Sequence, residues 1–275
     1  MWKSVIVTLL AAAAIGIVVE MQTGYLKYQL ATQLRAPEPG SVFALLAKRI
    51  MLTNEIPSQQ LVDLINPSPG SVVLEIGPGL GFGLEYLFGT YQPKQVYGME
   101  LSMDLFKGLK IKFADQFKTG QLKVYNQDAK NMAFLEDNSV DAIYALNVIY
   151  FLDPLSEYLQ EFHRVLKPGG ILAFGVFDEV KTMDSSIFVN QDWSICLEQM
   201  KRIGLEKTST GVLNGSGGGK ILKGTKPITP PPSVEEEIGD DRQEEAGKEA
   251  FNDDEKEEGY VEEEKDDSKE RGEEL

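Results

Sequence analysis

The stretch "VVLEIGPGLGFG", from Val72 to Gly83, joins an apolar run to four glycines that stand within seven positions. The run at 71–76 is rich in β-branched residues and predicts a short buried strand. Glycine loses more backbone entropy on folding than any other residue, so glycines at this density need a specific cause. A turn that lets a ligand approach the backbone closely is such a cause, and a tight turn alone explains only some of the glycines. Because Phe82 and Gly83 stand where a helix would normally start, the next helix is predicted to begin late, over 83–91.

Strands and helices alternate along the chain beyond this turn. Apolar residues at helical spacing separate most of the predicted strands, and residues 205–227 are predicted to form two strands around a glycine-rich turn. This alternation is typical of an α/β protein with a Rossmann-like, doubly wound and mostly parallel sheet that helices cover on both faces. The final two strands would add an antiparallel hairpin at the C-terminal edge. The other strands are predicted at 94–100, 121–128, 139–146 and 169–177.

Helices are also predicted before the sheet. Ser41 is expected to cap a helix over 42–51, and another helix is expected over 58–66. We interpret residues 22–70 as a cap that forms a lid over the cleft of a domain spanning 71–227.

The net charge of −16 is concentrated at one end of the chain. Residues 233–275 hold 21 Asp and Glu against 6 Lys and Arg, so residues 1–232 are nearly neutral. The lack of a basic stripe argues against a nucleic-acid partner. The acidic segment has almost no aliphatic residues and follows the stiff "ITPPPS", so residues 228–275 are predicted to be a proline-rich linker and a disordered tail. Simple solvation and contact with a basic partner are both open as roles for this tail.

Residues 1–21 contain an apolar segment in which no residue between Ser4 and Val19 is charged. As a helix this segment would span roughly 24 Å, against a hydrocarbon core of ~30 Å. Three interpretations are open: a membrane helix that anchors the chain, a helix lying in one leaflet, and a cleaved signal peptide with a site near Ala12-x-Ala14. The first is favoured and would leave the main domain in the cytosol, whereas the third would send it into the secretory pathway.

Polar residues follow the carboxyl ends of successive predicted strands. In a doubly wound sheet this edge holds the ligand, beside the first strand. Glu100 ends the second strand, 19 residues after Gly81, where an acid can accept hydrogen bonds from both hydroxyls of a ribose. Asp128 follows the third strand, where it can accept from an amine such as that of adenine, and Asn147 follows the fourth. A dinucleotide and S-adenosylmethionine both fit such a rim.

Several segments together resemble one enzyme family. With the opening stretch, "VYGMELS", "YNQDAKNMAFLEDNSVDAIYALNVIYFL" and "EFHRVLKPGGILAF" are similar to class I S-adenosylmethionine-dependent methyltransferases, in particular the type 11 group that contains the ubiquinone and menaquinone biosynthesis enzymes. The resemblance covers about 71–177, and "RVLKPGG" is its most specific part. It implies S-adenosylmethionine as the cofactor and methyl transfer to a small-molecule acceptor.

The resemblance also implies a role for each residue of the rim. Glu75 and the glycines of the turn would face the methionine portion of the cofactor, and Glu100 the ribose. Leu101 would pack beside the adenine, and Asp128 and Ala129, after the third strand, would contact the adenine amine. Asn147 and Val148, after the fourth strand, would border the cleft between cofactor and acceptor. Pro78 departs from the small or sulfur-containing residue common in the family, which would reshape the methionine pocket. The expected cofactor-binding residues are Glu75, Gly77, Pro78, Gly79, Gly81, Glu100, Leu101, Asp128, Ala129, Asn147 and Val148.

No catalytic residue can be assigned from the sequence. His163 falls on a predicted outer helix, where a packing role is favoured over that of a base, and Cys196 fits a buried position. One histidine and one cysteine make a metal site improbable. Tyr144, Tyr150 and Phe151 are candidates both for the acceptor pocket and for the core.

We therefore interpret the chain as a membrane-anchored methyltransferase that acts on a small, lipophilic acceptor. The apolar N-terminal segment is the reason for expecting a lipophilic acceptor. A catalytically inactive methyltransferase-like module that binds a partner is the first alternative. A nicotinamide-dependent oxidoreductase is the second and less favoured one.

Overall fold

The computed structural model describes residues 24–214 and 218–228, and nearer the N-terminus residues 5, 6, 8, 10, 12–14, 16 and 18. The chain divides into two compact units, Met1–Pro230 and Pro231–Leu275, and all described residues belong to the first. The predicted acidic tail, apart from Ile228, and much of the predicted anchor thus lie outside the described residues. Over the described part of the chain, no helix combines the length and the apolar character needed to cross a bilayer.

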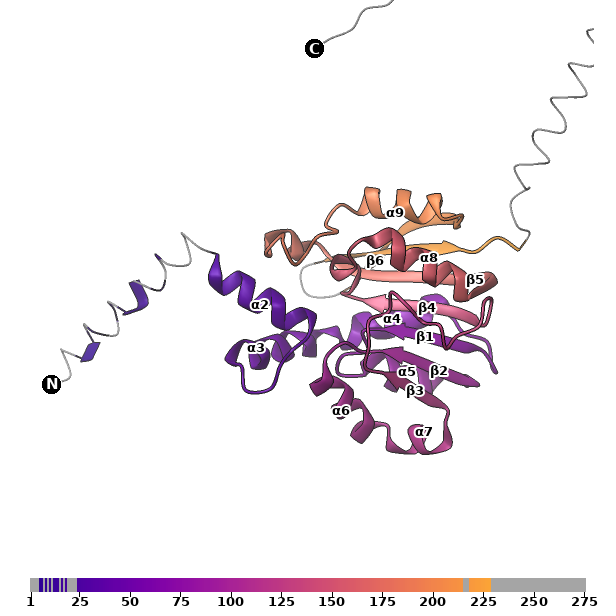
Figure 1. Cartoon of the computed structure of the whole chain (residues 1–275), viewed down its shortest axis with the longest axis horizontal. Coiled ribbons are helices and arrows are strands. Elements are labelled where there is room, and N and C mark those ends of the chain that lie inside the picture. The colour runs from indigo at the N-terminus through magenta and orange to yellow at the C-terminus, as the bar shows by residue number, and fades with distance from the viewer. Residues whose placement is uncertain are drawn as a thin grey trace, which may run out of the picture. The chain divides into compact units, whose positions relative to one another are not determined.

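Within the described residues, seven strands form one sheet in the order β3-β2-β1-β4-β5-β7-β6 (Figure 1). The first five strands of this order pair in parallel, while β7 pairs antiparallel with β5 and β6. The predicted α/β sheet with an antiparallel edge is therefore confirmed. The order reverses beside β1, which places the ligand-binding edge at the carboxyl ends of β1 and β4. The strands are β1 (Val72–Ile76), β2 (Gln95–Met99), β3 (Leu122–Tyr125), β4 (Val140–Leu146), β5 (Leu166–Phe177), β6 (Glu206–Leu213) and β7 (Gly219–Thr225).

Two apolar cores cover the two faces of the sheet. On β1, Val73 packs into a core with α4, α5 and α6, whereas Leu74 packs into a core with α8 and α9. Burial on both faces explains why the parallel strands are nearly continuous apolar runs. The helices are α2 (Tyr25–Arg35), α3 (Val42–Met51), α4 (Glu55–Ile65), α5 (Phe82–Thr90), α6 (Met103–Lys112), α7 (Ala114–Thr119), α8 (Leu155–Val165) and α9 (Trp193–Arg202), with 3-10 turns η1 (Leu52–Asn54), η2 (Ile149–Phe151) and η3 (Asp178–Thr182).

Several element boundaries differ from the sequence prediction. The helix after the glycine turn begins at Phe82, directly after Gly81, so the predicted late start is wrong. Strand β3 ends at Tyr125 rather than at 128, and β5 begins earlier than predicted, at Leu166. Gly83 thus lies inside α5 and does not interrupt the helix. Neighbouring side chains, described below, leave no room for a larger residue at this position.

The helices before the sheet form as predicted, with one change of length. The hydroxyl of Ser41 accepts a hydrogen bond of 3.4 Å from the amide of Ala44, which confirms the predicted cap of α3. Helix α4 begins at Glu55, three residues earlier than predicted, and ends where Asn66 adopts a left-handed conformation (φ 40°).

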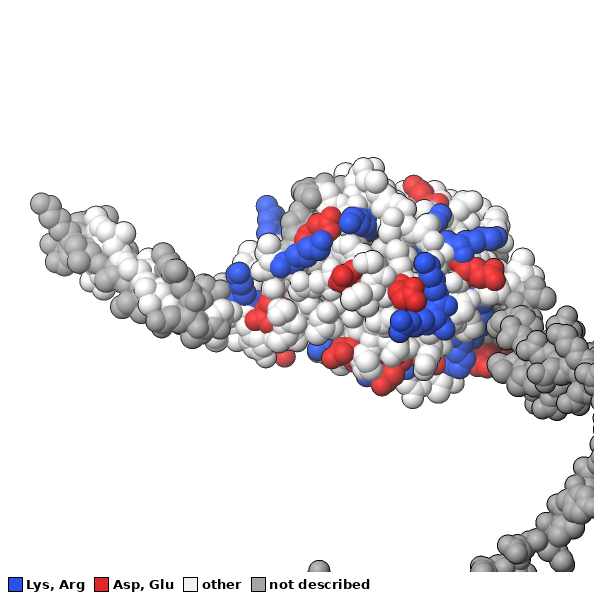
Figure 2. Space-filling view, turned by 90° about the horizontal axis from the view of Figure 1, so that it is seen from above, with Lys and Arg blue, Asp and Glu red and all other residues white. Residues whose placement is uncertain are grey.

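Charged side chains of both signs are interspersed over the face of the domain shown in Figure 2. This distribution agrees with the near-neutral charge of residues 1–232.

Candidate functional site

The turn after β1 is built on alternate glycines. Gly77, Gly79 and Gly81 have φ values of 68°, 59° and 79°, a left-handed region that side chains other than glycine rarely adopt. The amide of Gly81 closes the turn on the carbonyl of Pro78 at 2.8 Å. A Cβ atom on Gly79 would meet no atom closer than 3.9 Å, so this glycine faces open space. The predicted close approach of a ligand to the backbone is possible at this residue.

Pro78 packs against the neighbouring strand. A Cβ atom on Gly98 of β2 would lie 3.2 Å from the Cγ atom of Pro78, so the glycine leaves room for the proline ring. The unusual proline at position 78 is thus accommodated by a glycine on the neighbouring strand. A Cβ atom on Gly77 would lie 2.6 Å from the side chain of Val148, which brings the turns after β1 and β4 together.

Glu75 is buried beneath the turn. Its Oε2 atom accepts a hydrogen bond of 2.8 Å from the hydroxyl of Tyr144, its register partner on β4. Burial raises the pKa of Glu75 to about 8, and the nearby Glu100 adds to this shift. A Cβ atom on Gly83 would lie 2.6 Å from Glu75 Oε1, so the first turn of α5 closes over the carboxyl group.

Glu100 joins the glycine turn to the start of α6. Its Oε2 accepts a hydrogen bond from the amide of Gly79 at 3.0 Å, and its Oε1 accepts from the amide of Ser102 at 2.8 Å. Burial raises the pKa of Glu100, while these backbone hydrogen bonds oppose that rise. A carboxylate has lone pairs for about four hydrogen bonds, so both oxygens can still accept from a ligand.

Asp128 is held in place by a residue that the sequence did not point to. Its Oδ2 accepts a hydrogen bond of 2.9 Å from the hydroxyl of Tyr158 on α8, and its Oδ1 accepts from the amide of Lys130. Leu101 and Ala129, together with Asp128, line the cavity that is described below. Tyr158 resembles a core residue in the sequence, because it falls on the apolar face of a helix.

Asn147 connects the sheet to the cap. Its backbone has a positive φ of 58°, and its Nδ2 donates a hydrogen bond of 3.0 Å to Oδ1 of Asn54, at the end of η1. The Oδ1 atom of Asn147 is buried without a protein partner. A buried acceptor of this kind is costly unless something satisfies it, so a ligand donor at this point is chemically reasonable.

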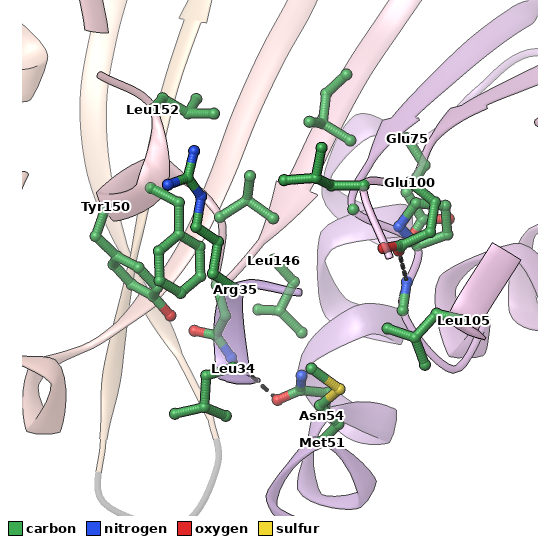
Figure 3. Close-up of a pocket in the computed structure, with 18 of the residues that line it drawn as sticks. Leu34, Arg35, Met51, Asn54, Glu75, Glu100, Leu105, Leu146, Tyr150 and Leu152 are labelled. Carbon is green, nitrogen blue, oxygen red and sulfur yellow. Dashed lines mark hydrogen bonds between the residues drawn. The ribbon is translucent and has the colours of Figure 1, made fainter. Parts of the chain in front are cut away.

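These groups line a single cavity of about 470 Å³. Figure 3 shows Glu75 and Glu100 at one side, which we call the acidic end, and Tyr150, Leu152 and Arg35 at the other. At that second side Phe188 stacks on Tyr150 with ring centroids 4.7 Å apart, and Phe151 packs edge-on against both rings. We call Tyr150, Phe151, Leu152 and Phe188 the apolar end.

The structure brings every predicted rim residue except Gly81 into the lining of this cavity. Gly81 lies just behind the lining, where a Cβ atom would lie 2.6 Å from the ring of Phe113. Residues of α2, α3 and α4, which precede the sheet, also line the cavity. Tyr150 and Phe151 line the cavity, whereas Tyr144 belongs to the core.

His163 and Cys196 take no part in this cavity. His163 lies on α8 outside the lining, and burial lowers its pKa. Cys196 is buried on α9, as predicted. Across the described residues, no group of three or more His, Cys, Asp and Glu side chains is placed to hold a metal ion.

Comparison with known proteins gives one family and a set of distant relatives. Residues 74–174 match the family described as "Methyltransferase domain". The chain is 32% identical over 127 residues to malonyl-[acyl-carrier protein] O-methyltransferase 1 of Coxiella burnetii, covering 46% of this chain and 40% of that protein. It is 33% identical over 142 residues to a sterol 24-C-methyltransferase of Gibberella zeae, covering 52% of this chain and 34% of that one. The chain thus matches well under half the length of these relatives.

The fold is shared with solved structures. One is a chain from the complex between the Haloferax volcanii Trm112 methyltransferase activator and a methyltransferase, with a TM-score of 0.57 and 16% identity. The match covers 66% of this chain and 93% of that chain. The strand order, the glycine turn and the acid after β2 are those that the resemblance in sequence implied. The family match covers the same part of the chain. Residues 74–174 are therefore similar to the methyltransferase domain family, and the structure gives them the α/β fold of the solved methyltransferase-complex chain.

Proposed function

We propose that the chain transfers a methyl group from S-adenosylmethionine to a small, lipophilic acceptor. The observation that carries this proposal is the shape of the cavity. One cavity of about 470 Å³ joins the acidic end, beneath the glycine turn, to the apolar end formed by Tyr150, Phe151, Leu152 and Phe188. A polar cofactor and an apolar acceptor would then meet within one cavity.

The residues of the acidic end fit the chemical groups of this cofactor. The open space beside Gly79 suits the methionine portion, and Glu75 would lie close to its positive charges. The two oxygens of Glu100 can accept from the ribose hydroxyls. Leu101 and Ala129 would border the adenine, and Asp128 would accept from its amine. Asn147 and Val148 would separate the cofactor from the acceptor.

S-adenosylmethionine, when bound, supplies the methyl group and a sulfonium that is itself a good leaving group. The chain then has to hold the two reactants in line and keep water away, and alignment alone accounts for a large part of a rate enhancement. The apolar end would orient the acceptor, and the cap would exclude water. No side chain has to be assigned as a general base for this mode of catalysis.

The acceptor class is proposed from the lining. Aromatic and aliphatic side chains dominate the apolar end, and Arg35 adds one positive charge there (Figure 3). A lipophilic molecule that carries an anionic group would match both features. The relatives named above act, by their names, on malonyl-[acyl-carrier protein] and on a sterol, and the sterol is an apolar acceptor.

The N-terminal segment is proposed as the membrane anchor, with the methyltransferase domain in the cytosol, where S-adenosylmethionine is made. A cleaved signal peptide and passage into the secretory pathway remain the alternative. For the acidic segment, solvation and contact with a basic partner stay open.

Calorimetric titration of the full chain with S-adenosylmethionine tests the cofactor. Binding is expected, while absence of binding at millimolar concentration, or preferential binding of a nicotinamide dinucleotide, would contradict the proposal. Incubation with methyl-labelled S-adenosylmethionine and a lipid extract then tests transfer, with label expected in the organic phase. Binding without any transfer to that phase or to water-soluble metabolites would favour the inactive binding module.

A further inference from the structure

Helix α3 exposes an apolar face to solvent. Val42, Leu45, Leu46 and Ile50 recur at the spacing of one helix face and are 70%, 70%, 47% and 40% exposed. The buried face of the same helix holds the small residues Ala44 and Ala47. This arrangement inverts the usual pattern of a surface helix, in which the large apolar residues face the core.

Further exposed apolar residues lie on the elements next to α3. Leu52 and Ile56, which follow it, are 46% and 61% exposed, and Tyr25, Leu26 and Tyr28 are exposed on α2. Exposed apolar residues that are contiguous, rather than scattered singly, mark interaction surfaces. In Figure 1, α2 and α3 stand together at one edge of the domain. We call the exposed residues Tyr25, Leu26, Tyr28, Val42, Leu45, Leu46, Ile50, Leu52 and Ile56 the lid face.

The charge of this region favours a lipid surface as the partner. Residues 24–56, which span the lid face, contain four basic residues, Lys27, Arg35, Lys48 and Arg49, and two acids, Glu38 and Glu55, in a chain of net charge −16. Of the basic residues, Arg35 lines the cavity. An apolar helix face bordered by basic residues and accompanied by tyrosines is typical of helices that lie in the interface of an anionic bilayer. Lys48 is tied to Asp104 of α6, which fixes α3 on the domain.

Two further features favour a bilayer as the partner of this face. The uncharged segment Ser4–Val19 is separated from the start of α2 by only five residues, so whatever that segment enters is brought near α2. Among its described residues, Val5, Ile6, Leu10 and Val18 are all more than half exposed. The cavity also reaches the lid face, because Ile50 is exposed and at the same time lines the cavity.

We propose that the lid face lies in the interface of an anionic lipid bilayer and that the lipophilic acceptor enters the cavity from that bilayer. The docking is independent of methyl transfer, and only the route of the acceptor rests on the proposed function. A protein partner on the same face is the competing outcome. The basic surround and the neighbouring apolar segment favour lipid.

A fluorescent reporter on α3 tests the docking in the full chain. The substitution Leu45→Cys carries an environment-sensitive nitrobenzoxadiazole label, and Ile111→Cys on α6, where the native side chain is 80% exposed, is the matched control. Burial raises the pKa of the natural Cys196 to about 12, so its thiol does not compete for the label. The probe is a vesicle of phosphatidylcholine and phosphatidylglycerol, with doxyl-labelled lipid as the quencher.

The expected result is a blue shift and quenching at position 45 and neither at position 111. No shift at position 45, or equal shifts at both positions, would overturn the proposal. A label at position 45 that is already shielded without vesicles, and is released on dilution, would identify a protein partner or a second copy and would also overturn it.

A second variant separates docking from folding. In a chain labelled at Leu52→Cys, the changes Val42→Gln, Leu45→Gln and Leu46→Gln are expected to abolish the vesicle-induced shift, whereas Ile111→Gln with Val212→Gln is not. Calorimetric binding of S-adenosylmethionine should be the same in both variants, so a failure of docking can be told apart from a failure of the proposed function. A full shift that survives the three glutamines would mean that α3 does not carry the contact.

Discussion

Glu75 and Tyr144 are partners across β1 and β4, and their side chains share a hydrogen bond of 2.8 Å in the interior beneath the glycine turn. Burial of the carboxyl group disfavours its charged form, which is why the pKa of Glu75 is raised to about 8. At neutral pH Glu75 is therefore mostly protonated when no cation is near. A positively charged ligand would favour its ionised form, so the protonation of Glu75 and ligand binding are coupled.

The first prediction concerns stability against pH. Because the pKa of Glu75 rises from 4.5 to about 8 on folding, the native state holds more protons than the unfolded state between these values. The free energy of unfolding should therefore fall as pH rises through this window. Glu75→Gln should reduce the slope, since the amide oxygen can still accept from Tyr144. Urea denaturation at several pH values measures it, with the exposed Glu136→Gln as the control. An unchanged slope in the Glu75→Gln variant would show that Glu75 titrates normally.

The second prediction concerns the affinity for the cofactor. If S-adenosylmethionine binds beside ionised Glu75, binding releases a proton, and affinity should rise with pH up to about 8, by at most about tenfold per pH unit. S-adenosylhomocysteine has no sulfonium charge and should show a weaker dependence. Calorimetry in buffers of different ionisation enthalpy counts the protons released. Equal pH profiles for the two ligands would place the sulfonium away from Glu75.

The third prediction compares two glycines of α5. A Cβ atom on Gly83 would lie 2.6 Å from Glu75 Oε1 and 2.8 Å from the hydroxyl of Tyr144, so Gly83→Ala should destabilise the domain by about 1–3 kcal/mol. A Cβ atom on Gly89 would meet nothing within 4 Å, so Gly89→Ala should stabilise it by about 0.5–1 kcal/mol. Chemical denaturation of both variants gives the difference. Similar changes in the free energy of unfolding at the two positions would mean that Glu75 and Tyr144 shift at little cost to make room for the added methyl group.

The sheet and its ligand-binding edge could be predicted from the sequence, because both depend on local patterns. Buried parallel strands leave continuous apolar runs, and the polar residues that follow them must gather at one edge. The start of α5 could not be predicted, because glycine disfavours a helix. At position 83 it is required, since a Cβ atom would clash with other side chains. That requirement comes from the side chains of Glu75 and Tyr144, and Tyr144 is distant from Gly83 in the sequence.

Partners of the predicted residues were the part that sequence reasoning missed. Asn54 meets Asn147 across 93 positions, and only the packing of the cap on the sheet brings them together. Tyr158 has the spacing of a core residue on α8, and its hydroxyl becomes relevant only because α8 lies beside Asp128. A residue that acts through its tip while its ring packs in the core leaves no local signal.

The fourth prediction concerns Glu100. Glu100→Ala should weaken binding of S-adenosylmethionine by about 1–3 kcal/mol, through loss of charged hydrogen bonds to the ribose. It also removes the acceptors of the Gly79 and Ser102 amides, so thermal unfolding should be followed in parallel. Asp115→Ala, at an exposed acid of α7, serves as the control. Unchanged affinity in a folded Glu100→Ala variant would mean that the ribose binds elsewhere.

The fifth prediction tests whether Tyr158 orients Asp128 toward the adenine amine. Tyr158→Phe removes the donor 2.9 Å from Asp128 Oδ2 and should weaken binding of S-adenosylhomocysteine by about 0.5–1.5 kcal/mol. The inosine analogue, which has a carbonyl in place of the amine, should be affected less, because it gains nothing from an oriented Asp128. Tyr91→Phe is a matched control, since the hydroxyl of Tyr91 bonds Asp63 at the same distance of 2.9 Å outside the cavity lining. Equal losses for the two ligands would show that Tyr158 supports the cavity as a whole and does not position Asp128 for the amine.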